Sequence, residues 1–197
     1  MPAAAPSLDA LRARIRAMER LKPPPPDDVE VHAAVTRRIA PACLHQILGE
    51  PGPATALAAG IAGRLAARLE RPVLWVLEED DLHLPGLAAF GLSPGAVIVA
   101  AAGDATKALW SMEEGLKSAA LACVVGEVAV LDMTAGRRLQ LAAETGGTTG
   151  VILHPPGARA ANAGTTRWRV AGLPGSRWRL TLERGRDGMP GEWEVAV

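Results

Sequence analysis

Hydrophobic residues change their spacing twice along the chain. Near the N-terminus they recur every three or four residues, in the centre they form short runs, and near the C-terminus they alternate with polar residues. The first spacing is typical of an amphipathic helix, the second of buried strands between helices, and the third of strands with one solvent face. The pattern predicts an N-terminal helix over residues 1–22, a proline-rich connector over 23–40 and a domain over 41–197.

The N-terminal helix is predicted to run from Ser7, its N-cap, to Leu21. Four consecutive prolines at 23–26 end it, because proline lacks the N–H group that a helix requires. A helix separated in this way must bury its apolar side chains on its own domain or on another protein. We treat it as a candidate partner-docking helix that could also join copies of the chain into a homo-oligomer. Its apolar stripe is Leu8, Leu11, Ile15, Met18 and Leu21.

The central region alternates apolar runs with helical segments. Helices are predicted over residues 53–69, from an N-cap at Asp104 to about 118, and from an N-cap at Thr134 to Gly146 and Gly147. Apolar strands that alternate with helices form mostly parallel sheets covered on both faces, so the predicted fold class is α/β. The predicted strands are 44–48, 73–77, 96–101, 122–126 and 149–153.

Two Arg-Trp-Arg triplets, ten residues apart and joined by a Gly/Pro turn, predict an antiparallel hairpin within residues 155–197. Alternation places Trp168 and Trp178 on one face and the arginines on the other. Arginines with nearby tryptophans could follow nucleic-acid phosphates and stack on bases. We favour contact with a protein partner or with solvent, because the tryptophans are expected to point into the core. This candidate face for a partner or weak DNA contact consists of Arg167, Arg169, Arg177 and Arg179.

Composition narrows the possible classes of protein. The chain has 197 residues, and its 21 Lys and Arg residues balance 21 Asp and Glu residues, which excludes a globally basic nucleic-acid coat protein. The N-terminus lacks the basic and apolar regions of a secretory signal, and no apolar run is long enough to span a bilayer. We therefore expect a cytoplasmic protein without membrane contact. Cys43 and Cys123 are expected to be buried, reduced thiols.

Residues 44–56 resemble a phosphate-binding loop in their order of strand, glycine-rich loop and helix. A Walker A motif, G-x-x-x-x-G-K-[ST], uses its lysine to reach the phosphates and its hydroxyl to hold Mg²⁺. Counted from Gly49, the second glycine is replaced by Ala54, the lysine by Thr55 and the hydroxyl residue by Ala56. We therefore expect no nucleotide hydrolysis and no cofactor. The degenerate phosphate loop comprises Gly49, Gly52, Ala54, Thr55 and Ala56.

Acidic residues follow two of the predicted strands. Glu79 lies in an acidic run, 78–81, after the second strand, and Glu127 follows the fourth. P-loop ATPases place catalytic carboxylates at such positions, but without a phosphate site these two are vestigial. The four histidines lack the spacing of a metal site, and no nucleophile motif is present. The sequence therefore predicts neither a catalytic centre nor a metal centre.

Five segments occur in a specific order: LPGLAAFGL at 84–92, ALWSMEEGL at 108–116, VVGE at 124–127, LDMTAGRRLQLAAE at 131–144 and TRWRV at 166–170. Together they resemble the ImuA family, RecA- and SulA-related proteins encoded in bacterial inducible-mutagenesis cassettes. The resemblance covers residues 44–197, and RRLQLAAE is its most specific part.

The resemblance implies a RecA-like core and a role in the SOS response, in DNA-damage-induced translesion synthesis. Its implied partners are ImuB, a catalytically inactive Y-family polymerase homologue, a C-family error-prone DNA polymerase and RecA. With the degenerate Walker motif, the expectation is a non-catalytic accessory factor that bridges ImuB or the polymerase and RecA-coated DNA. Two alternatives remain open at this point: a SulA-like inhibitor of cell division, and a weak P-loop ATPase with a non-standard loop.

Overall fold

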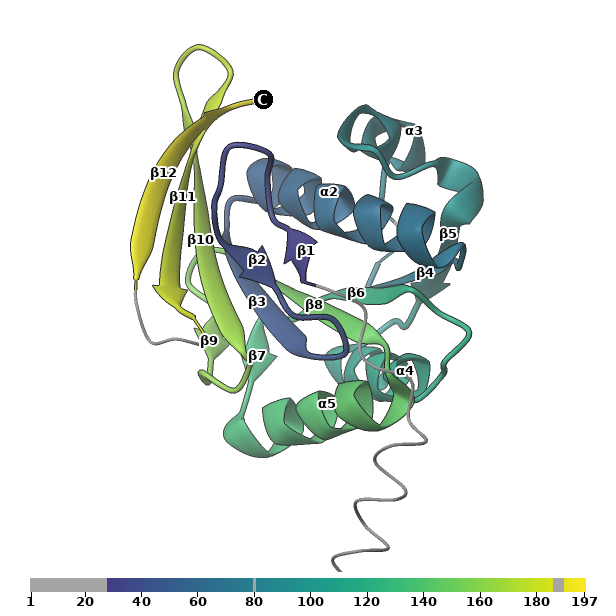
Figure 1. Ribbon diagram of the computed structural model, residues 1–197. Helices are drawn as coiled ribbons and strands as arrows, with labels where there is room; N and C mark the ends of the chain where they lie inside the picture. The colour runs from purple at the N-terminus through teal and green to yellow at the C-terminus, as the bar shows by residue number, and fades with distance from the viewer. Residues whose placement is uncertain (1–27, 80, 186–189) are drawn as a thin grey trace, which may run out of the picture.

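One eight-stranded sheet forms the centre of the computed structural model, which describes residues 28–79, 81–185 and 190–197 (Figure 1). The strand order is β12-β11-β10-β3-β8-β6-β4-β5. Helix α2 (Pro51–Leu69) covers one face, and α4 (Ala105–Leu116) and α5 (Met133–Gly146) cover the other (Figure 1). The prediction of an α/β fold with a mostly parallel sheet between helices is confirmed.

Six neighbouring strands of this sheet run parallel to one another. Five of them agree with the predicted strands to within one residue at each end, because continuous apolar runs are typical of strands buried on both faces. Their bounds are β3 (Leu44–Gly49), β4 (Val73–Leu77), β5 (Val97–Ala101), β6 (Cys123–Glu127), β8 (Thr149–His154) and β10 (Thr166–Leu173).

Apolar side chains of the strands form two core layers, since successive residues of a strand point to opposite faces. Ile47 and Trp75 belong to the layer beneath α2. Leu44, Val76 and Met112 belong to the layer beneath α4 and α5. All five side chains are fully buried, so the sheet is held from both sides by hydrophobic burial.

The predicted C-terminal hairpin is present and continues the central sheet. Strand β10 pairs antiparallel with β11 (Arg177–Arg184), which pairs antiparallel with β12 (Gly191–Ala196). On its other side β10 runs parallel to β3. The hairpin is therefore an extension of the main sheet, with the carboxyl end of β3 beside the middle of β10.

Helix ends follow the predicted chemistry in two of three cases. The Asp104 carboxylate accepts a hydrogen bond from the Lys107 N–H at 2.8 Å, as an N-cap should. Gly147 adopts a left-handed conformation after α5, also as predicted. The predicted N-cap at Thr134 is wrong: Asp132 caps α5 by accepting from the Ala135 N–H at 2.7 Å. The helix starts earlier because strand β7 (Val130–Leu131) ends directly before Asp132.

Residues 28–40, which the sequence assigns to the connector, pack on α2. Strand β1 (Val29–Glu30) pairs with β2 (Arg38–Ile39), and Val29, Val35 and Ile39 are buried. The predicted helix with Leu8, Leu11, Ile15, Met18 and Leu21 lies outside the described residues.

The remaining elements are short. They are α3 (Leu84–Leu87), the 3₁₀ helices η1 (Ala88–Phe90) and η2 (Pro94–Ala96), and β9 (Arg159–Ala160), which pairs with β7. Cys43 and Cys123 are buried free thiols, as expected, and burial raises the pKa of Cys123. None of the helices in the described part of the chain has the length and apolar character needed to cross a membrane.

Candidate functional site: the acidic edge and the arginine face

The connection between β3 and α2 is a single residue. Glu50 alone separates Gly49, the last residue of β3, from Pro51, the first residue of α2. The helix thus begins two residues before its predicted start, as proline is favoured at the first helical position. The expected glycine-rich loop is absent, because Gly52, Ala54, Thr55 and Ala56 lie in the first turns of the helix. No stretch of loop backbone is left there to surround a phosphate.

The start of α2 also offers few hydrogen-bond donors. The first four N–H groups of an α-helix have no partner within the helix and can bind anions. Here Pro51 and Pro53 have no N–H group, and the Ala54 N–H donates to the Glu50 carbonyl at 3.0 Å. Only Glu50 and Gly52 retain a donor at these positions. The helix start is therefore a poorer anion site than a Walker A loop.

Gly49 has a packing role that the sequence does not reveal. A Cβ atom at this position would lie 2.3 Å from the Val170 carbonyl oxygen on β10, whereas a Cβ at Gly52 would meet nothing within 4 Å. Gly49 is therefore required for the close approach of β3 and β10. Because Val170 is distant in the sequence, no local pattern distinguishes this glycine from a phosphate-loop glycine.

Carboxylates gather beside the start of α2, where β4 and β6 end. Glu127, half-buried at the end of β6, lines a cavity of about 390 Å³ together with Gly52, Thr55 and Asp81. The exposed Glu79 lines a neighbouring cavity, to which Glu127 also contributes. The structure thus brings Glu127 near the degenerate loop residues and places Glu79 farther out. We call this group the acidic edge; it consists of Glu78, Glu79, Asp81 and Glu127.

The electrostatics of the acidic edge oppose phosphate binding. Burial raises the pKa of Glu127, and the nearby carboxylates of Asp81 and Glu78 raise it further. No Lys or Arg of the described chain forms an ion pair with these three residues. Like charges repel most strongly where water is partly excluded, so a phosphate would be unfavourable here. Within residues 28–79, 81–185 and 190–197 no cluster of three His, Cys, Asp or Glu residues could hold a metal ion.

The second candidate region is the arginine face, which consists of Arg167, Arg169, Arg177 and Arg179 on β10 and β11. The four side chains lie on the face of the sheet opposite Trp168 and Trp178. Both tryptophans are buried, with exposed fractions of 1% and 9%. Their predicted orientation toward the core is confirmed, so neither ring is available in this structure to stack on a nucleic-acid base.

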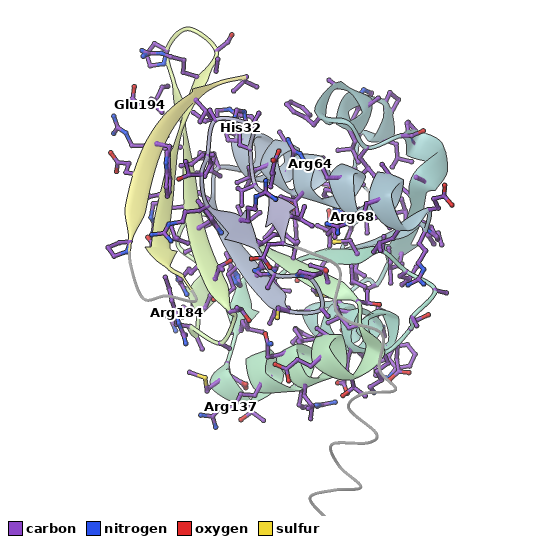
Figure 2. The ribbon with its side chains drawn as sticks, in the orientation of Figure 1. His32, Arg64, Arg68, Arg137, Arg184 and Glu194 are labelled. Carbon is purple, nitrogen blue, oxygen red and sulfur yellow. The ribbon has the colours of Figure 1, made fainter. Side chains whose placement is uncertain are left out.

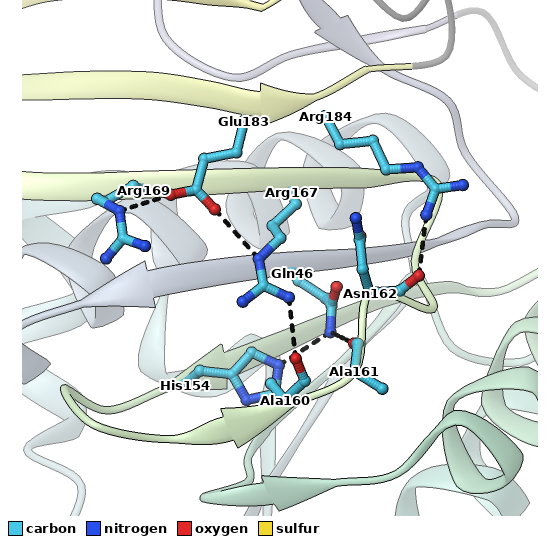
Figure 3. A network of polar contacts seen from close by, with 9 residues as sticks. All are labelled: Gln46, His154, Ala160, Ala161, Asn162, Arg167, Arg169, Glu183 and Arg184. Carbon is cyan, nitrogen blue, oxygen red and sulfur yellow. Dashed lines mark hydrogen bonds and ion pairs between the residues drawn. The ribbon is translucent and has the colours of Figure 1, made fainter.

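Each arginine of this face is paired with a carboxylate. Glu183 accepts from Arg169 Nε at 2.6 Å and from Arg167 Nε at 3.1 Å (Figure 3). Glu194 pairs with Arg179 at 2.9 Å and with Arg177 at 3.3 Å, and the Arg179 guanidinium lowers the pKa of this glutamate. The glutamates of β12, which pair with these arginines, are not among the residues predicted from the sequence. The alternating Gly-Glu-Trp-Glu pattern at 191–194 is a signal that could have indicated them.

A buried polar cluster lies below Arg167. The Arg167 guanidinium donates to the Ala160 carbonyl at 3.2 Å, and the Gln46 amide donates to the Ala161 carbonyl at 2.9 Å (Figure 3). His154 Nδ1 lies 2.7 Å from the Val128 carbonyl, and burial lowers the pKa of this histidine. These bonds attach the segment after β8 to the sheet. Arg184, at the edge of the same region (Figure 2), donates to the Asn162 carbonyl at 2.9 Å (Figure 3).

Comparison with known proteins adds an independent observation. No protein-family model matches the chain. The chain is 39% identical over 142 residues to Protein ImuA of Caulobacter vibrioides strain NA1000 / CB15N, and equally to Protein ImuA of strain ATCC 19089 / CIP 103742 / CB 15. Each match covers 61% of this chain and 58% of the relative, so the chain spans less than two thirds of the length of these relatives. The resemblance to ImuA is confirmed.

Proposed function

We propose that this ImuA-like chain is a non-catalytic accessory protein of DNA-damage-induced translesion synthesis. The similarity to Protein ImuA supports a place in an inducible-mutagenesis cassette. The absence of catalysis is inferred from one observation: a single residue connects β3 to α2, next to the acidic edge. A backbone without a loop cannot encircle a phosphate, and the nearby carboxylates would repel one.

The core is proposed to be RecA-like. Strand β3, which leads into α2, lies inside the sheet between the parallel strands β8 and β10. An interior strand followed by a helix that crosses back to another parallel strand is the framework on which P-loop proteins build their phosphate site. The chain keeps this framework, while the residues that would bind phosphate are replaced. We therefore do not extend ATP-driven activity to this protein.

The proposed partners are ImuB, a C-family error-prone polymerase and RecA on DNA. Two surfaces of different character, the acidic edge without cations from the described chain and the arginine face with its paired glutamates, support a bridging role because they can contact chemically different partners. The candidate docking helix over residues 7–21 would provide a third contact.

Nucleotide hydrolysis provides the first test. We expect no release of phosphate when the purified chain is incubated with ATP and Mg²⁺. The double variant Thr55→Lys, Ala56→Ser restores the side chains of a Walker motif without changing the backbone. We expect it to remain inactive too, because the loop itself is absent. ATP hydrolysis by the unmodified chain would contradict the proposal and support the weak ATPase.

Partner binding provides the second test. Purified chain should be captured by ImuB, by the polymerase or by RecA filaments on single-stranded DNA. A version lacking residues 1–22 retains all described residues, so loss of capture by this version would assign the contact to the predicted helix. Absence of binding to all three partners would overturn the bridging role. Filamentous growth on overexpression in cells without imuB would instead favour the SulA-like alternative.

A further inference from the structure

The structure divides the arginine face into two unequal halves. Arg177 and Arg179 lie on the open surface of β11, whereas Arg167 and Arg169 line a pocket of about 460 Å³. The pocket lies between the end of β3, the segment 155–158 and strand β10. We propose that this pocket, rather than the degenerate loop before α2, is a phosphate-binding site of the protein. This inference goes beyond the proposed function, since it assigns a ligand to residues that the accessory role does not require.

Arg169 provides the accessible donors. Its Nε atom donates to Glu183 at 2.6 Å, and this is the only hydrogen bond or ion pair that the described chain makes with its side chain. The side chain remains 52% exposed. A guanidinium group held at Nε keeps both terminal nitrogens in a planar fork, and this fork matches two oxygens of a phosphate. Glu183 therefore orients Arg169 without using its terminal donors.

Arg167 forms the fixed part of the pocket. It is only 15% exposed and is held by Glu183 at 3.1 Å and by the Ala160 carbonyl at 3.2 Å. Figure 3 shows the guanidinium groups of Arg167 and Arg169 on the same side of β10, with Glu183 bonded to both. Because this geometry exists before a ligand arrives, binding would require little ordering of side chains.

The opposite wall is a rigid turn. The Ala158 N–H donates to the Pro155 carbonyl at 3.1 Å, and Gly157 has a φ of 80°. Pro156 followed by glycine at the two central positions is typical of a type II turn, which fixes the backbone on this side. The Gly157 N–H has no hydrogen-bond partner in the described part of the chain, and Gly157 lines the pocket.

Nearby charges determine how tightly the pocket is expected to bind a phosphate. Glu50 also lines the pocket, and Glu183 neutralises part of the charge of the two arginines. A single phosphate should therefore bind weakly, and a chain of phosphates should bind more tightly because several cations act together. The shared ligand chemistry is a phosphate group, either in a nucleic-acid backbone or in a free nucleotide.

The test compares two equivalent variants. Binding of a fluorescent oligo-dT strand is measured for the full chain, for Arg169→Gln and for Arg177→Gln. Both arginines are 52% exposed and paired with a glutamate, but only Arg169 lines the pocket. Loss of a charge-assisted contact should weaken binding about tenfold for Arg169→Gln. The salt dependence of its log affinity should also fall by about 0.7. Arg177→Gln should change affinity less than about twofold.

Competition distinguishes the two sources of phosphate. Displacement of oligo-dT only by high concentrations of both inorganic phosphate and ADP would indicate a backbone phosphate, and displacement by low ADP concentrations would indicate a free nucleotide. Glu50→Gln should tighten binding about threefold by removing a repulsive charge. Equal losses for Arg169→Gln and Arg177→Gln, with unchanged thermal unfolding, would overturn the pocket. Absence of binding to all three probes would overturn it as well. Partner capture is a separate assay, so failure of the pocket leaves the proposed function intact.

Discussion

The acidic edge and the arginine face belong to one sheet, separated by β3 and β8, and their charged side chains have opposite kinds of neighbours. On the arginine face, Glu183 and Glu194 each pair with two arginines. At the acidic edge, Glu127 is half-buried and faces Asp81 with no cation from the described chain. Accordingly the pKa of Glu194 is lowered and that of Glu127 is raised. Ion pairs therefore stabilise the arginine face, whereas repulsion between carboxylates destabilises the acidic edge around its cavity.

The largest expected effect on the free energy of unfolding concerns the buried tryptophan on the other side of the sheet from the arginine face. Trp168 is 1% exposed and lies on the opposite side of β10 from Arg167 and Arg169. Trp168→Ala should lower the free energy of unfolding by about 3–5 kcal/mol, because it leaves a cavity in the core. Chemical denaturation would measure the loss.

Trp110 provides the matched control, since it is the same residue type at 63% exposure on α4. Trp110→Ala should change the free energy of unfolding by less than about 0.5 kcal/mol. Equal losses for the two variants would show that the burial of Trp168 does not account for its contribution to stability.

The ion pairs of the arginine face should contribute less. Glu183→Gln removes the carboxylate shared by Arg167 and Arg169, and Arg167 is only 15% exposed. We expect a loss of about 1 kcal/mol in the free energy of unfolding that shrinks in high salt, because salt screens surface pairs. Glu192→Gln is the control, since Glu192 is 60% exposed and 3.6 Å from Arg179. A loss for Glu183→Gln that does not vary with salt would argue against an electrostatic origin.

The smallest expected effect has the opposite sign. Glu127→Gln should stabilise the protein at pH 7 by about 0.5 kcal/mol, a modest value because solvent screens the half-exposed carboxyl. The pKa of Glu127 in the folded protein lies above its ordinary value near 4.5. The folded state therefore binds a proton at this carboxyl more tightly than the unfolded state does. Stability should therefore fall as the pH rises from about 4.5 through the raised native pKa. Thermal unfolding across this range should show a smaller decline for the variant; identical pH profiles would refute the repulsion.

The sequence by itself determined the elements whose causes are local. Apolar runs located β3, β4, β5, β6 and β8, because a strand buried on both faces has a continuous hydrophobic pattern. The Asp104 cap and the left-handed Gly147 depend on a few neighbouring residues, and the alternation around Trp168 and Trp178 indicated which face is buried. The replaced Walker lysine at Thr55 was also evident without a structure.

Only the tertiary structure decided features that join distant segments. Gly49 resembles a loop glycine until β10 places the Val170 carbonyl 2.3 Å from its missing Cβ. In the sequence the four arginines look equivalent. In the structure, strand pairing places Glu194 opposite Arg179, whereas Arg169 lines a pocket with the 155–158 turn. Register and chain crossings depend on the packing of the whole core, so no local pattern contains them.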